Sequence, residues 1–240
     1  MAKSPPSRSK GFFSDINLFL LKKPKFRTLI KFESESERLN YSYRIMQRLG
    51  ISVTRYSVLN IHKIGIETPV KYVFEELLKW DGDSTCWPNY IANVSRIDNS
   101  LENIHIYLFG WRKYPFGLKN RFLGFKYIPL FNINVKKFQI VPDPVDVDNA
   151  RYLLYNCSGG YPIGVFAMYV RSSIAELNEK DQAQLFFVVG FNFYGKENWS
   201  KRNILHKTWE MFHDRVTSHT MIRIKQLCEW RFEKIQAGLD

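Results

Sequence analysis

Few residues of this chain have the types and spacing that chemistry needs, and the five histidines are the most informative of them. His206 and His213 lie seven residues apart on an expected helix, which places them about 10.5 Å apart along its axis. One metal ion cannot bind both. Glu210 and His213 have the i, i+3 spacing of di-iron bundles, but such sites need a second pair and two more glutamates. The sequence holds no second copy, so it predicts no metal site and no cofactor.

Two histidines remain as candidate acid–base residues. His105 falls on an apolar strand pattern, and His213 lies beside Phe212 on the expected final helix. A buried, neutral histidine can exchange a proton near pH 7. The alternative is that both are hydrogen-bonded residues in or near the core. Since the motifs of nucleotide-binding loops, metalloproteases and serine hydrolases are absent, catalysis stays open and non-catalytic binding is favoured.

The composition is that of a globular protein with two unusual features. Of 240 residues, 45% are hydrophobic and 24% are charged, which excludes disordered and collagen-like classes. The chain is rich in rings (19 Phe, 13 Tyr and 6 Trp), and its net charge is +12. The rings favour a core or cavity of large side chains, and the charge favours an anionic partner. Three widely spaced cysteines indicate reduced thiols, and no segment approaches the roughly 20 apolar residues of a membrane span. We therefore expect a cytoplasmic protein.

The first 33 residues form a basic segment that we expect to be partly disordered. Apolar residues at positions 12, 13, 16, 19 and 20 have the spacing of one helical face. Lys22, Lys23 and Lys25 follow, and the first 31 residues hold eight basic side chains and one acidic one. This pattern is typical of a helix at a membrane interface. The alternative is a helix that docks on the domain, followed by a solvated linker.

A second basic segment, residues 111–127, alternates cations with rings. Its cations are Arg112, Lys113, Lys119, Arg121 and Lys126, and it contains six aromatic residues and no acid. This mixture suits single-stranded nucleic acid or anionic lipid headgroups. It also fits a hairpin whose rings point inward and whose charges are solvated.

The order of the expected elements defines an α+β fold. A capping box at residues 34–37 begins a helix, whose apolar stripe is Leu39, Tyr43, Met46 and Leu49. A strand at 57–67 and a helix at 70–78 follow, and then several strands that are apolar on both faces. One face must pack on a helix, and the other must meet a second layer or a cavity. A long helix ends the chain, and we expect it to overhang the domain, bend or break near residues 217–220.

This order resembles that of the START-like, polyketide-cyclase superfamily, also called SRPBCC or helix-grip proteins. Residues 67–78 are similar to the family's opening strand, proline and first helix, and Trp87-Pro88 is similar to its second helix. The resemblance covers about residues 57–237. It implies a curved antiparallel sheet of about six or seven strands that grips the last helix, with an apolar cavity between them. It also implies binding of lipids, sterols or polyketides, and it transfers no catalytic residue.

We accordingly predict one such domain at residues 34–240, led by a docking helix, with residues 1–33 as a basic tail. The predicted function is binding of an apolar or lipid-like molecule in an aromatic-lined cavity, with contact to an anionic membrane as a secondary hypothesis. The residues expected to line the cavity are Tyr107, Phe109, Phe166, Met168, Phe187, Phe191, Trp209, Phe212 and Val216. The alternative for each is that it fills the core. Two other hypotheses are a polyketide cyclase-like enzyme that uses His105 or His213, and a nucleic-acid-binding module that uses residues 111–127.

Overall fold

The computed structural model describes residues 12–49, 52, 56, 58–78, 92–96, 103–108, 132–139, 150–159, 163–173, 180–192 and 204–239. The elements in chain order are α1 (Phe12–Asp15), the π-helical turn η1 (Ile16–Leu21), α2 (Glu35–Arg48), β1 (Val58–Ile66), α3 (Val70–Leu78), β2 (Ala92–Arg96), β3 (Asn103–Leu108), β4 (Asn132–Gln139), β5 (Ala150–Gly159), β6 (Ile163–Ser172), β7 (Ala183–Asn192) and α4 (Ile204–Gln236). The strand and the helix predicted between residues 57 and 78 are confirmed as β1 and α3.

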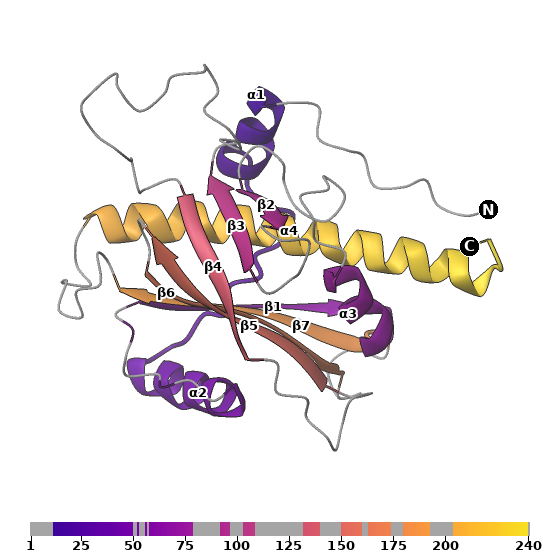
Figure 1. Ribbon diagram of the computed structural model, residues 1–240, viewed down its shortest axis with the longest axis horizontal. Coiled ribbons are helices and arrows are strands. Elements are labelled where there is room, and N and C mark those ends of the chain that lie inside the picture. The colour runs from indigo at the N-terminus through magenta and orange to yellow at the C-terminus, as the bar shows by residue number, and fades with distance from the viewer. Residues whose placement is uncertain are drawn as a thin grey trace.

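The strands form one antiparallel sheet in the order β1-β7-β6-β5-β4-β3-β2 (Figure 1). From β2 to β7, each strand pairs with its neighbour in the chain, and β1 joins the sheet beside β7. The predicted α+β fold, with an antiparallel sheet and a C-terminal helix, is confirmed.

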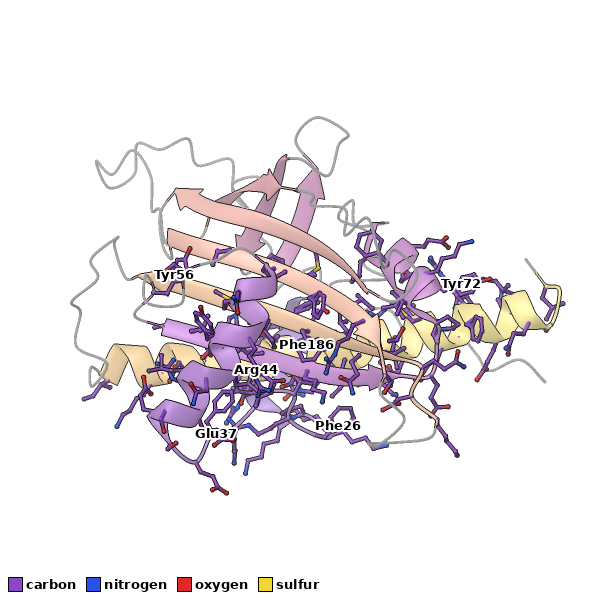
Figure 2. All side chains as sticks on the ribbon, turned by 90° about the horizontal axis from the view of Figure 1, so that it is seen from below. Phe26, Glu37, Arg44, Tyr56, Tyr72 and Phe186 are labelled. Atoms are coloured by element: carbon purple, nitrogen blue, oxygen red, sulfur yellow. The ribbon has the colours of Figure 1, made fainter. Side chains whose placement is uncertain are left out.

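Strands β1, β6 and β7 are buried on both faces, and a different layer of helices covers each face. One face carries Ile64, Phe166 and Phe187, which pack with residues of α3 and α4 in one apolar cluster. The other face carries Ile61 and Phe186, which pack with residues of α2 in a second cluster. Figure 2 shows α2 lying across this second face, with Phe186 on the sheet beside it. We call these the α4 side and the α2 side of the sheet. The second layer expected from the two-sided strands is therefore α2, at least over these three strands.

The start of α2 is the predicted one, but its buried face is different. The Ser34 hydroxyl accepts a hydrogen bond from the Glu37 backbone N–H at 3.1 Å, as a capping box requires. Met46 and Leu49 are buried, as predicted, whereas Leu39 and Tyr43 are exposed. The face that meets the sheet is Ser42, Ile45, Met46 and Leu49, which also has helical spacing. The prediction for Leu39 and Tyr43 was wrong because the buried face is rotated toward Ser42 and Ile45.

Helix α4 is continuous from Ile204 to Gln236, so the break considered near residues 217–220 does not occur. The polar side chains there are buried and hydrogen-bonded: Thr220 Oγ1 donates to the Val216 carbonyl at 2.8 Å, and Ser218 contacts the N-terminal segment. The helix does overhang the domain, because its C-terminal turns extend beyond α3 in Figure 1. No helix in the described part of the chain is long and apolar enough to cross a membrane.

The N-terminal segment docks on α4 and then on β1. The Phe19 ring is buried and lies edge-on to His219, with 5.5 Å between the ring centroids. Arg215 Nη1 donates to the Leu20 carbonyl at 2.7 Å. Farther on, Leu29 forms a β-bridge with His62 at the open edge of β1. The segment therefore follows the docking interpretation, and the boundary drawn at residue 33 stays a prediction.

The role of α2 as a packing layer can be tested by two substitutions on the same helix. Met46→Ala should lower the free energy of unfolding by about 2–5 kcal/mol, because it leaves a cavity against the α2 side of the sheet. Tyr43→Ala removes a larger but exposed side chain and should change it by less than about 0.5 kcal/mol. Denaturant unfolding of both variants measures this difference, and equal effects would contradict the assigned face.

Candidate functional site

The α4 side of the sheet holds the described rings that the sequence assigned to a cavity. Phe166, Met168 and Phe187 are all buried there, and the Phe166 and Phe187 rings meet edge to face, with centroids 5.6 Å apart. Directly opposed residues in antiparallel strands share a face. In the register, Phe187 lies opposite both Met168 and His62. Phe191 lies opposite Val58, which is two positions along β1 from Asn60. By this alternation Phe191 is on the same side of the sheet as Phe187.

Apolar residues continue along the α4 side into the strands that lie farther from β1. One row of partners runs from Val135 on β4 to Ile104 on β3, and a second runs from Ile133 through Ile106 to Val94. The rows that alternate with these are polar. They contain Asn93, Ser95, His105, Asn132, Asn134 and Ser158. From β2 to β4 the α4 side is therefore mostly apolar, with Arg96 and Lys137 as exceptions, and the other side is mostly polar, with Tyr107 as an exception.

Helices cover only part of this apolar side. Helix α3 packs on β5, β6 and β7, and α4 packs most extensively on β1. Among the described residues, neither helix makes a comparable contact with β2, β3 or β4. By register, the rows of Ile104, Ile106 and Val135 are on the same side of the sheet as α4.

The other predicted cavity residues are not all brought to this side. Tyr107 pairs with Asn93 and Asn132, so the register separates it from the rows that contain Phe166 and Phe187. On α4, Val216 is partly buried, whereas Phe212 is 38% exposed. Phe109 lies outside the described residues, as does the side chain of Trp209. The basic segment 111–127, with Arg112, Lys113, Lys119, Arg121 and Lys126, also lies outside them.

A chain of polar side chains, buried except for the half-exposed Arg27, joins the N-terminal segment, β1 and α4. The Arg27 guanidinium forms an ion pair with Asp214, with Nε donating to Oδ2 at 2.6 Å. Asp214 Oδ1 accepts from the Ser218 hydroxyl at 3.3 Å. Thr28 Oγ1 lies 3.1 Å from Ser218 Oγ and 2.9 Å from His62 Nδ1.

The hydroxyl protons determine the tautomer of His62. Ser218 uses its single proton on Asp214, so Thr28 must donate its proton to Ser218. Thr28 Oγ1 can then only accept from His62, which carries its proton on Nδ1. The Nε2 atom is therefore left as an acceptor. It is buried and forms no hydrogen bond with any residue that the structure describes.

His213 completes the cluster, and both imidazoles are kept neutral. The rings of His62 and His213 lie edge to face, with centroids 5.6 Å apart. Burial lowers the pKa of His62 well below its ordinary value of 6.5, and repulsion by Arg27, and by His213 whenever that ring is protonated, lowers it further. Burial alone lowers the pKa of His213 to about 4. Either histidine can therefore accept a proton near pH 7 only when a negative group beside it stabilises the imidazolium that forms.

Sequence reasoning selected one member of this pair and missed the other. His213 was a candidate, but its neighbour His62 was not, and His105 lies in a polar row on the opposite side of the sheet. The alternation of residues along β1 could have indicated that His62 is buried, because His62 shares a strand face with Ile64 and Ile66. No local pattern connects Thr28 with Asp214 or Ser218. Within the described residues, no three His, Cys, Asp or Glu side chains come together as a metal site.

A separate pocket of about 250 Å³ lies at the edge of β1, between the start of α2 and α4. Apolar side chains and four polar residues, Glu35, Arg38, Asn60 and Glu210, line it. Arg38 is paired with Glu35. The pKa of Glu210 is raised, because burial raises it more than the charge of Arg38 lowers it. The pocket is smaller than most small-molecule sites, which occupy roughly 300–1,000 Å³. Its lining contains none of the rings that were expected to form the cavity.

Comparisons with known proteins give structural neighbours only. No family model matches the chain, and no curated protein matches it in sequence. The chain is similar to a conserved protein from Geobacillus kaustophilus, with 14% identity, a TM-score of 0.40, and coverage of 71% of this chain and 95% of that one. It is also similar to the Zhui aromatase/cyclase from Streptomyces sp. R1128, with 10% identity, a TM-score of 0.42, and coverage of 75% and 97%. A Polyketide_cyc-like protein from Corynebacterium glutamicum has 10% identity, a TM-score of 0.35, and coverage of 75% and 93%.

Two of these structures carry polyketide-cyclase names. The functional proposals that follow are argued from this chain's own residues.

The buried histidine pair predicts how stability depends on pH. In the unfolded chain both histidines titrate near pH 6.5, whereas in the folded protein they stay neutral to a lower pH. Between these values the unfolded state binds more protons, so the free energy of unfolding decreases as pH falls. The decrease approaches about 1.4 kcal/mol per pH unit for each histidine.

Denaturant unfolding between pH 6.5 and 5, above the range in which most carboxylates titrate, measures this slope. The double variant His62→Gln/His213→Gln should show a much flatter profile, whatever its stability at pH 7. An unchanged slope in the double variant would contradict the assignment.

Proposed function

We propose that the protein binds a hydrophobic or lipid-like molecule between the α4 side of its sheet and α4. The observation that carries the proposal is the run of apolar register rows on β2, β3 and β4. By register these rows share the α4 side with the Phe166–Phe187 ring pair. Apolar surface of this extent is unfavourable in water at about 25 cal/mol per Å². A buried apolar ligand would remove it from water.

In this proposal β2, β3 and β4 curve round the N-terminal half of α4 and complete the grip. Phe187 and Phe166 form the inner wall, where the core cluster with α3 and α4 begins. Phe191 is on the same side by register, and in this proposal Trp209, Phe212 and Val216 of α4 face the ligand from the helix. Removing water from an apolar ligand supplies the binding energy, and the few polar groups nearby set its orientation.

Native mass spectrometry of the purified protein tests the proposal directly. A co-purified apolar molecule, or uptake of one from a lipid mixture at near one-to-one stoichiometry, is the expected result. Organic extraction then identifies the class of molecule. A clean apo mass without any uptake would indicate that side chains fill the interior, and it would overturn the proposal.

Two adjacent positions on β3 offer a matched pair of variants. Ile106 lies in the rows of the α4 side, and Tyr107 lies in the rows of the α2 side. Ile106→Asn should weaken uptake by about tenfold or more, because a buried amide without a partner costs about 1–3 kcal/mol. Tyr107→Asn should leave uptake nearly unchanged. Equal losses in the two variants would point to damage of the fold rather than of a cavity.

The second candidate function is a cyclase-like enzyme, and the buried His62–His213 pair favours it. Both rings are neutral, and His62 carries the acceptor Nε2 on the α4 side of the sheet, on β1, at the edge opposite to β2. Such an atom could take a proton from a bound carbonyl compound. The test is a kinetic one: His213→Gln should abolish turnover of a cyclisable substrate while leaving its binding intact. Full turnover in that variant would remove this candidate.

A further inference from the structure

The docked N-terminal segment leaves a set of apolar side chains in solvent. Phe19 faces α4, but four other side chains of the segment point away from the core. They are Phe13, Leu21, Phe26 and Leu18, which are 83%, 63%, 42% and 39% exposed. Large apolar side chains gathered on one short segment mark an interaction surface more often than isolated ones do. Figure 2 shows Phe26 at the margin of the molecule, beyond the edge of the sheet formed by β1.

Exposed lysines lie among these apolar residues. Lys22, Lys23 and Lys25 are all exposed, and their ammonium groups form no ion pair within the part of the chain that the structure describes. The segment from Ile16 to Lys31 contains no acidic residue. On α4, where the N-terminal segment docks, Asp214 is already paired with Arg27. The surface formed by the four apolar residues and these three lysines, called the N-terminal patch below, is therefore both apolar and cationic.

The backbone beneath the patch is held in place from both sides. His219 lies 3.1 Å from the Lys22 carbonyl, and Arg215 donates to the Leu20 carbonyl. After the patch, the Thr28 carbonyl accepts from the Lys63 N–H of β1 at 2.8 Å. The apolar face that the sequence suggested for membrane contact is thus partly used for docking through Phe19. A different set of residues is left outside, and it is presented on a fixed support.

We propose that the N-terminal patch docks the protein on an anionic lipid bilayer. Exposed Phe and Leu side chains can enter the headgroup and upper acyl region, while the long lysine side chains extend to the phosphates. Each lysine near an anionic surface contributes about 1 kcal/mol of attraction. A protein partner or a second copy of this chain would be expected to match some of the positive charge with acidic groups. From Phe13 to Lys31 the sequence holds five basic residues and one acid, Asp15, so its charge is strongly positive and an anionic bilayer is the partner that it fits.

The proposal goes beyond ligand binding, and its test needs no ligand. The full-length protein is sedimented with vesicles of phosphatidylcholine alone and with vesicles that also contain phosphatidylserine. Binding is expected to the anionic vesicles only, and it should weaken as salt screens the lysines. Lys22→Gln/Lys23→Gln/Lys25→Gln should lower the partition coefficient by roughly 100-fold, from the attraction of about 1 kcal/mol for each lysine.

The apolar contribution has a closely matched control. Leu21 and Leu239 are the same residue type and are 63% and 60% exposed, but Leu239 lies at the far C-terminal end of α4. Leu21→Ser should lower binding to anionic vesicles by about tenfold, and Leu239→Ser should leave it unchanged. Because both side chains are exposed, neither change should alter the unfolding transition.

Three results would overturn the proposal. The first is an absence of binding to anionic vesicles at low salt. The second is binding that the triple lysine variant leaves unchanged, which would assign it to another basic segment. The third is self-association in analytical ultracentrifugation that Leu21→Ser abolishes, which would make the patch an interface between copies of this chain. Each result stands apart from native mass spectrometry of the cavity, so either proposal can fail alone.

Discussion

The structure depends on one constraint: strands β1, β6 and β7 are apolar on both faces, so neither face can remain in water. Val165 and Phe166, or Phe186 and Phe187, are neighbours in sequence and point to opposite sides, yet all are buried. Two layers of helix are therefore needed, and they come from opposite ends of the chain. Helix α2 covers one side, and α3 with α4 covers the other. Farther from β1, on β4, β3 and β2, the rows on the α2 side become mostly polar.

The N-terminal segment is attached to this core by polar contacts as much as by apolar ones. The chain from Arg27 through Asp214, Ser218 and Thr28 to His62 closes the seam between three elements. Its members are hydrogen-bonded to one another, which removes most of the cost of burying them. The cost that remains is at the imidazoles, which must stay neutral. The same contacts hold the N-terminal patch, which directly precedes Arg27, at the surface. One short stretch of chain therefore takes part both in the packing of the core and in the proposed membrane surface.

Periodicity predicted most elements because each pattern is local. The period of two marked the strands, the 3.6-residue period marked α2 and α3, and Ser34 with Glu37 marked the start of α2. The errors concern which face is buried. Leu39 and Tyr43 extend the stripe of Met46 and Leu49 backward by helical spacing, yet Ser42 is the residue that meets the sheet. Tyr107 shares the aromatic character of Phe166, but its register position is on the other side.

The sequence by itself determined the α+β class, the order of elements and the surplus of rings and positive charge, because these follow from local patterns and from composition. Tertiary structure alone decided which of two apolar strand faces meets α4, which histidine accompanies His213, and which apolar residues of the N-terminal segment remain in solvent. These choices depend on strand register and on contacts between residues far apart in the chain, such as Thr28 and Ser218. A local pattern cannot contain them, because either side of a two-sided strand, and either face of a short helix, satisfies it equally well.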